Sequence, residues 1–327
     1  MNRKFLFVCT LAAGSLSLHA DEEATKYVTF PEKVAPWFTG PLISTSGYTT
    51  PAGHVNVEPY LYYTVYPGRY DNHWKARSLP NFYSTTLQVQ IAVGVAKNIS
   101  FQIYPQAFHN ETEGRHDTNV GDLPIALNFQ LYRPPEGSLW PSAKLALRAS
   151  VPFGKYQHLN PHLKKTDANG AGSWFPGVGL TFAKIWNTSG IHFLESRLSL
   201  NYLIGTAVHV KGINTYGGAR NTRGFVYPGN IFTADYSVQY NFTQRWAFAC
   251  DLFYAHTNKN RFSGRVGSSH GVPAQMRAPS NEQWSLAPAI EYNWSQNLGI
   301  IVGPWFSFAG RNSAEFISGV AALNAFF

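Results

Sequence analysis

Apolar and polar residues alternate with a period of two in about a dozen segments of the chain. Between residues 232 and 242, Phe, Ala, Tyr, Val, Tyr and Phe alternate with Thr, Asp, Ser, Gln and Asn. Segments 85–95 and 284–294 follow the same rule. This is the period of a β-strand with one apolar face. We therefore predict twelve strands between residues 54 and 327, the last of which ends at Phe327.

The links between these segments alternate in length. Short links fall at 96–98, 187–190, 243–245 and 295–297, with a medium one at 133–140. Long links fall at about 67–80, 109–119, 154–173, 206–230 and 257–282, and the link at 310–312 is a short exception. Outer-membrane barrels join their strands by short periplasmic turns and longer outer loops. The pattern predicts an all-β fold, a transmembrane antiparallel up-and-down β-barrel of about twelve strands.

Composition supports a surface that faces lipid. Only 13% of the residues are charged, whereas 15% are aromatic. Aromatic residues gather near the short links, as at Trp186, Trp246 and Trp294, and near the long links, as at Tyr63 and Phe82. Aromatic girdles at both interfaces are typical of membrane barrels. A soluble β-sandwich also alternates, but it has no need of tryptophan at both ends of its strands.

The N-terminal region divides into two parts. Residues 1–20 have the features of a signal peptide, because a basic start precedes an apolar run and a small residue before the acidic Asp21. Export and a barrel together predict the outer membrane of a Gram-negative bacterium. Residues 21–53 lack periodicity, and we expect them to be a periplasmic extension or a small plug before the barrel at 54–327. No other segment reaches the run of roughly 18 apolar residues that a spanning helix requires.

Charged residues on the predicted inward face are candidates for lining the lumen. They are Glu58, Asp122, Lys144, Arg148, Glu195, Arg197, Asp235, Asp251, Glu291 and Glu315. The set predicts either a lumen that favours cations and polar neutral solutes, or a salt-bridged network with Asp122 facing Lys144 and Arg148. Twelve strands lie between filled eight-stranded barrels and wide sixteen-stranded porins. We therefore expect a narrow or gated pore.

Six prolines fall in the outer halves of the predicted strands. They are Pro105, Pro124, Pro152, Pro176, Pro288 and Pro304. Proline has no N–H to donate to a ladder, so it is usually confined to edges, strand starts and bulges. One hypothesis is a lateral gate, at which the outer half of the wall releases apolar solutes into the membrane. The alternative is that each proline only ends the ladder at the rim.

The sequence offers little for catalysis or nucleic-acid binding. The nearest arrangement to a hydrolase triad is Ser268-Ser269-His270, which lies in a long link without strand context. We predict no enzymatic activity, no metal site and no cofactor. The long links are rich in Lys and Arg, which favours contact with phosphates of outer-membrane lipid and glycolipid, or capture of anionic solutes. No dense basic run with interleaved aromatics is present, which argues against nucleic acid.

Several short motifs carry a resemblance to a known family. They lie at Gly40–Leu42, Thr50–His54, Val120–Leu123, Val151–Gly154 and Gly170–Gly172. From about Trp37 to the end, the chain resembles the outer-membrane family labelled "MetA-pathway of phenol degradation", whose members are described as transporters. The resemblance implies export or uptake of small compounds, apolar or aromatic ones among them. It supplies no catalytic residues.

These observations predict a passive outer-membrane channel or transporter for small solutes. The alternative is a structural or adhesive barrel whose long outer loops bind a partner. Besides lipid, glycolipid and a small-molecule solute, the expected partner is the barrel-assembly machinery, which would recognise the strand that ends at Phe327.

Overall fold

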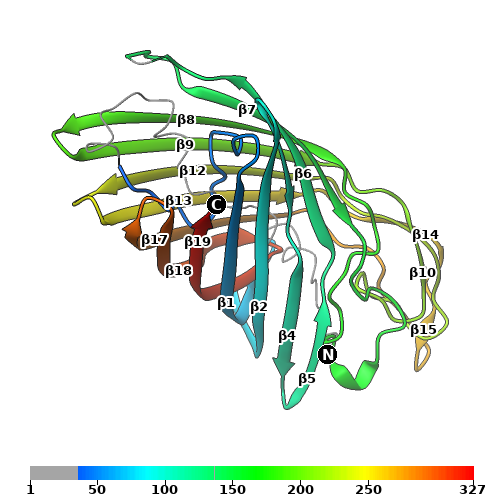
Figure 1. Ribbon diagram of the computed structural model, residues 1–327. Coiled ribbons are helices and arrows are strands. Elements are labelled where there is room, and N and C mark those ends of the chain that lie inside the picture. Colours follow the sequence, from blue (N-terminus) through cyan, green and yellow to red (C-terminus); the bar gives the residue numbers. More distant parts are fainter. Residues whose placement is uncertain (1–35, 136) are drawn as a thin grey trace.

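The computed structural model describes residues 36–135 and 137–327, and the predicted signal peptide lies outside this range. The described chain forms a closed barrel of twelve antiparallel strands, which confirms the predicted fold (Figure 1). The sheet contains 14 strand segments because two wall strands are each divided in two. The wall consists of β1 (Val55–Tyr70), β2 (Ala76–Ala96), β3 (Ile99–Ile103) with β4 (Gln106–Thr112), β5 (Arg115–Val120) with β6 (Leu123–Tyr132), β7 (Ser142–Val151), β8 (Gly177–Ser189), β9 (His192–Leu203), β12 (Ile231–Asn241), β13 (Trp246–Thr257), β17 (Asn281–Ser295), β18 (Leu298–Arg311) and β19 (Ala314–Phe326). No helix in the described part of the chain is long and apolar enough to cross a membrane.

The barrel closes where its first and last strands meet. β1 pairs with β2 on one side and with β19 on the other. The terminal Phe327 extends this seam, because its amide donates to the carbonyl of Val55 and its carbonyl accepts from the Val55 amide, at 2.8 and 3.0 Å. Closure joins the first wall strand to the last, as a strand structure in a bilayer requires. In this sheet, only β5, in the hairpin with β4, keeps an edge without a paired strand among the described residues.

The two faces of the wall follow the predicted alternation. Along β12, the buried Asp235 and Ser237 alternate with the exposed Tyr236. On other strands, Leu61, Leu87 and similar apolar residues on the outward face are about half exposed. One correction concerns the aromatic girdles, because Phe82 is buried on the inward face opposite Tyr66. The outward set therefore forms the lipid-facing surface, and the inward set fills the interior.

The long links divide into two kinds, and the sequence did not distinguish them. Links 67–80 and 109–119 are largely strand. In the first, β1 continues to Tyr70 and β2 begins at Ala76; in the second, β4 and β5 are joined by a two-residue turn. The turn residues Glu113 and Gly114 both have positive φ, as a tight hairpin turn requires. Extended hairpins satisfy their own backbone groups, so these links do not need loop structure.

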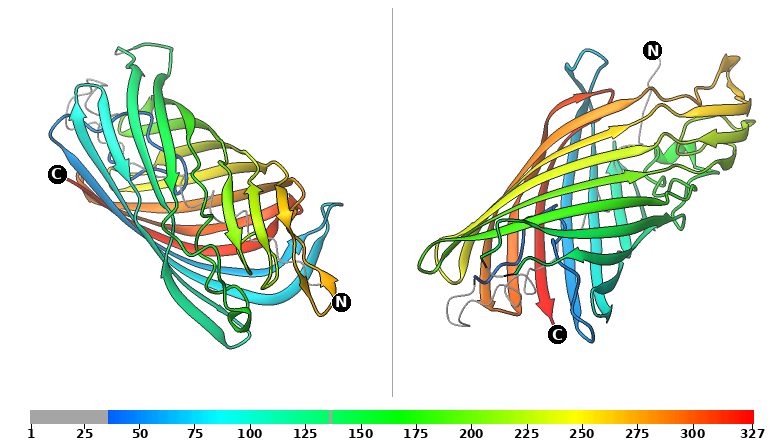
Figure 2. Two further views of the ribbon diagram at one scale, coloured as in Figure 1. Left: turned by 90° about the vertical axis from the view of Figure 1, so that its right-hand side faces the viewer. Right: turned by 90° about the horizontal axis from the view of Figure 1, so that it is seen from above.

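The remaining long links fold into an outer subdomain. They hold the short helix η1 (Pro161–Leu163), the sheet β10 (Val208–Lys211), β11 (Arg223–Tyr227) and β14 (Arg261–Arg265), and the pair β15 (Ser268–Ser269) and β16 (Val272–Pro273). Val208, Val210, Val226 and Met276 form its buried core. Figure 2 shows these elements projecting beyond one end of the barrel, opposite the end at which the chain terminates.

An inner segment, residues 36–53, precedes β1 and runs within the ring of strands (Figure 1). Every residue from 38 to 50 is buried. Thr49 at its far end is held by Gln130 of β6, whose Oε1 accepts the Thr49 amide at 2.9 Å. The interior of the barrel is therefore filled in part by its own chain.

Candidate functional site

Two buried acids of the inner wall hold the inner segment by its backbone. The amides of Thr39 and Gly40 donate to Glu291 Oε2 on β17, at 2.7 and 3.4 Å. The amides of Ile43 and Ser44 donate to Asp251 on β13, at 3.3 and 3.1 Å. Bonds between an amide and a carboxylate are stronger than neutral ones. These side chains therefore anchor a segment in the lumen, a role that the alternation pattern did not indicate.

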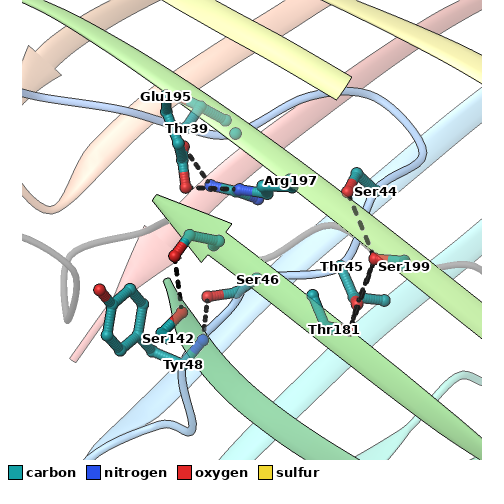
Figure 3. A network of polar contacts seen from close by, with 12 residues as sticks. Thr39, Ser44, Thr45, Ser46, Tyr48, Ser142, Thr181, Glu195, Arg197 and Ser199 are labelled. Atoms are coloured by element: carbon teal, nitrogen blue, oxygen red, sulfur yellow. Dashed lines mark hydrogen bonds and ion pairs between the residues drawn. The ribbon is translucent and has the colours of Figure 1, made fainter. Parts of the chain in front are cut away.

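Hydroxyl groups of β9 and β8, a pair of strands separated from β13 by β12 alone, also hold the segment. The hydroxyls of Thr45 and Thr181 of β8 lie 2.9 Å apart, and those of Ser44 and Ser199 of β9 lie 3.5 Å apart (Figure 3). Thr45 also contacts Ser199 at 3.3 Å. Neutral hydrogen bonds of this kind each contribute about 1 kcal/mol net. The segment thus follows the inner wall from β17 and β13, past β12, to β9 and β8.

The apolar side chains of the inner segment pack on one part of the inner wall. Leu42 and Ile43 are 2% and 3% exposed and belong to a single buried cluster with residues of β1, β13, β17, β18 and β19. The wall residues of this cluster are small or aromatic: Tyr60, Ala249, Phe253, Ala255, Ala287, Ala289, Ile301, Trp305, Phe316, Val320 and Ala322. The alanines leave room on the inner face that Leu42 and Ile43 occupy.

Five rings form a continuous aromatic track on the inward face, which we define as Phe82, Tyr66, Phe316, Trp305 and Phe253. Successive ring centroids lie 6.0, 6.4, 5.0 and 6.1 Å apart. The contacts are edge-on or tilted, the arrangement that aromatic pairs prefer. Phe82 and Tyr66 lie toward the long-loop end of β2 and β1, and Trp305 and Phe253 reach the cluster that holds Leu42 and Ile43. A contiguous row of packed apolar rings, four of them 1–7% exposed, therefore runs inside the barrel from the outer half to the cluster of Leu42 and Ile43.

Three of the predicted lumen residues form closed polar groups on the wall. Glu58 accepts hydrogen bonds from Asn56, Tyr60 and Gln90 at 2.8, 3.1 and 2.7 Å. Glu195 and Arg197 form a bidentate ion pair at 2.7 and 2.8 Å, and both side chains are fully buried. The partners in both groups are residues of the same strand or of its neighbour.

Asp122 lies at the interruption between β5 and β6 and faces an outer loop. Its two carboxylate oxygens accept the amides of Gly154 and Ala171, at 2.9 and 2.7 Å. Arg148 donates to Asn201 at 2.7 Å, and Lys144 is buried on the same strand. Asp122 thus tethers the link that follows β7 to the barrel mouth.

Asp235 and Glu315 differ most from the expected ion-pair network. Both carboxylate oxygens of Asp235 are buried without a hydrogen-bond partner among the described residues. Glu315 is a correction: it is half-buried at a bulge opposite Gly68, out of step with the inward Phe316 and Ser318. The bulge lies on β1, where two residues oppose Phe316, and β19 itself continues without a break. Glu315 therefore shares the outward parity of Ile317 and lies outside the buried inner row.

Three of the six prolines lie outside the strand ladders, and a fourth lies within a paired strand. Pro105 separates β3 from β4, Pro152 follows β7, and Pro176 precedes β8. Pro124 lies within β6 in continuous register with β7, opposite Ser150. The carbonyls of Pro105, Pro124 and Pro176 each accept an amide of a neighbouring strand, at 2.8–3.0 Å. Backbone hydrogen bonds therefore join the wall beside these prolines, and we do not propose a lateral gate there.

Pro288 and Pro304 form a different arrangement, because they lie opposite each other. The register between β17 and β18 runs from Leu286 opposite Phe306 to Ile290 opposite Val302, and paired residues are missing between these points. Each proline keeps its partner on the other side, Cys250 on β13 and Gly319 on β19. The two absent N–H groups therefore face one another. A Cβ placed on Gly303 would lie 2.1 Å from the Pro288 carbonyl oxygen, so the strands stay close although the ladder is broken.

The inward aromatics and the inner segment were missed by the sequence interpretation. Phe253, Trp305 and Phe316 fall on the parity expected to be polar. That departure was visible in the run Pro304–Phe308, where apolar residues occupy both parities. In residues 36–135 and 137–327, no group of three or more His, Cys, Asp or Glu is placed to hold a metal ion.

The comparisons with known proteins identify a fold. No family model matches the sequence, and no curated protein matches it. The COG4313 outer membrane channel from Pseudomonas putida F1 shares 12% identity with a TM-score of 0.66, over 86% of this chain and 98% of that one. The P. putida toluene transporter TodX shares 11% identity with a TM-score of 0.38, over 96% and 99% of the two chains, a score that supports no inference. The fold is that of an outer-membrane β-barrel.

Proposed function

We propose that this protein is an outer-membrane channel that passes small apolar or aromatic solutes. The observation that carries the proposal is the aromatic track on the inward face of the barrel. A water-filled lumen is lined by polar groups, whereas these five rings present a continuous apolar surface. Such a surface lowers the free energy of an apolar solute by about 25 cal/mol for each Å² removed from water.

The wall beside the track supports a lateral exit between β17 and β18. Trp305 directly follows Pro304, and Ala287 directly precedes Pro288, so the inward residues next to the broken ladder belong to the apolar cluster. A solute on the track lies beside the least bonded stretch of these two strands. An apolar solute gains by leaving toward lipid instead of water. We therefore keep the lateral-gate hypothesis for Pro288 and Pro304.

Uptake of labelled toluene by intact cells tests the channel. The glycolipid outer leaflet slows apolar solutes, so expression of the folded protein is expected to raise the initial uptake rate. Trp305→Ala removes the central ring of the track and should abolish most of that increase. Trp294→Ala is the matched control, because Trp294 faces outward and is 45% exposed. If expression does not change toluene uptake, the proposed function is wrong.

The alternative of a structural or adhesive barrel rests on the outer subdomain. β10, β11 and β14 form an ordered sheet with its own buried core, which could present a surface to a partner. Ion conductance in planar bilayers and toluene uptake separate the two functions. A folded barrel that supports neither favours the structural function. Recognition of the strand ending at Phe327 by the assembly machinery remains a prediction.

A further inference from the structure

Leu42 and Ile43 of the inner segment belong to the same buried cluster as three rings of the aromatic track. Both side chains pack in the cluster that contains Trp305 and Phe253, at the inner end of the track. If these two side chains left, their place would be an apolar cavity lined by rings and by Ala287. A cavity of this kind binds an apolar guest, because apolar cavities stay dry and accept molecules such as benzene.

The polar atoms of the lining are already bonded within the protein. Trp305 Nε1 donates to Ser285 Oγ at 2.9 Å, and Tyr60 Oη donates to Glu58 at 3.1 Å. A ligand at this position would therefore gain by burying apolar surface, and it would not have to supply a hydrogen bond to either side chain. This chemistry selects an aromatic hydrocarbon over a polar or charged solute of similar size.

We propose that Leu42 and Ile43 occupy the solute-binding site of the channel and act as its built-in competitor. The site is the place of these two side chains at the inner end of the aromatic track, and its ligand class is a small aromatic hydrocarbon. Solute binding releases the stretch 38–46 from the wall. The inference rests on the proposed function, because it names the site through which the solute passes.

The contacts of the inner segment allow such an exchange. In the stretch 38–46, the polar contacts include hydrogen bonds to side chains on β8, β9, β13 and β17, and Thr49 beyond this stretch stays bonded to Gln130 of β6. They are not a strand ladder, so each can break without unfolding the wall. The solute replaces the buried apolar area that the segment gives up. The equilibrium between docked and released segment is then set by these few polar bonds and by solute concentration.

A disulfide that fixes the segment tests the exchange. Thr45→Cys with Thr181→Cys places two thiols where hydroxyls lie 2.9 Å apart, in a Cys250→Ala background. Thr64→Cys with Ser318→Cys is the matched control, because those hydroxyls also lie 2.9 Å apart but join β1 to β19 without touching the segment. Oxidation of the first pair should abolish toluene uptake, and reduction should restore it. Oxidation of the control pair should leave uptake unchanged.

A second variant tests the competitor directly. Leu42→Ala with Ile43→Ala removes six buried carbons, so the docking equilibrium shifts by on the order of 1,000-fold toward the released segment. Toluene uptake should rise severalfold at an equal amount of folded protein. Unchanged uptake in both the oxidised lock and this variant would overturn the inference while leaving the channel intact. Absence of uptake in the unlocked protein would instead refute the proposed function.

Discussion

Replacing Pro288 and Pro304 by valine restores two backbone donors to the ladder between β17 and β18. The register places the two prolines opposite each other, and each retains its partner on its other neighbour. Both restored N–H groups therefore point across the gap, toward carbonyls that the facing strand supplies. Valine also suits a lipid-facing strand position.

The expected gain follows from the number of bonds. One backbone hydrogen bond contributes about 0.5–1.5 kcal/mol net, so two contribute about 1–3 kcal/mol. The unfolding equilibrium should shift by roughly 5- to 150-fold, since 1.4 kcal/mol is a factor of ten. The free energy of unfolding is measured by denaturant titration of the barrel in lipid vesicles. Hydrogen exchange at residues 287–289 and 303–305 should slow in parallel.

Toluene uptake of the double variant distinguishes a wall that only lacks hydrogen bonds from a lateral gate. If apolar solute leaves between β17 and β18, the double variant should lose most toluene uptake while it gains stability. Pro59→Val is the control, because Pro59 interrupts the β1–β19 register between Val57 and Tyr60 but does not face a second proline. Normal uptake in a stabilised double variant would refute the lateral exit. Unchanged stability would refute the argument from missing donors.

Three further changes test the interior, the outer hairpin and the seam. Glu195→Gln should cost about 3–5 kcal/mol of unfolding free energy because it removes the bidentate carboxylate partner of the buried Arg197 guanidinium. Replacing both residues by leucine and methionine should be nearly neutral in denaturant titration. Hydrogen bonds that backbone amides donate to Asp71, foremost the one from Lys75, lower the pKa of the Asp71 carboxyl to about 2. This stabilises the hairpin tip above about pH 4 and is lost as pH falls toward 2, so hydrogen exchange there should rise in that window in the wild type and not in Asp71→Asn. Deleting Phe327 removes the two backbone bonds that extend the seam and should reduce the heat-resistant folded band on gels.

Most of the wall could be predicted from the sequence because its driving force is local. A strand with one face in lipid and one face inward must alternate, so Tyr236 and Asp235 reveal their sides by parity alone. The rule also places Glu315 outward, because this residue shares the parity of Ile317, so the prediction of an inward Glu315 was wrong. Alternation cannot show that links such as 109–119 continue as a hairpin, because polar residues are compatible with strand outside the membrane.

The candidate site could be predicted only in part, because it depends on contacts between distant residues. Asp251 and Glu291 were identified as inward acids, yet their partners are backbone amides more than 200 positions away in the chain. Backbone amides carry no sequence signal. Alternation does not reveal the aromatic track either, because Trp305 lies on the parity of its strand that is expected to be polar. The other four rings of the track come from β1, β2, β13 and β19.

The broken ladder and the inner segment belong to one structural unit. Leu42 and Ile43 share a cluster with Ala287 and Trp305, which border the gap between Pro288 and Pro304 on its inward side. The docked segment therefore supports the wall where β17 and β18 lack hydrogen bonds. Its release would uncover the track and remove that support in the same step.

This coupling gives a last prediction. Oxidation of the Thr45→Cys, Thr181→Cys pair should slow hydrogen exchange at 287–289 and 303–305, although neither cysteine lies on β17 or β18. Leu42→Ala with Ile43→Ala should accelerate it. The oxidised Thr64→Cys, Ser318→Cys pair is the control for residues 287–289, because it joins β1 to β19, and β19 pairs with β18 but not with β17. It should leave the exchange at 287–289 unchanged. Equal exchange rates in all three proteins would show that the segment and the wall open independently.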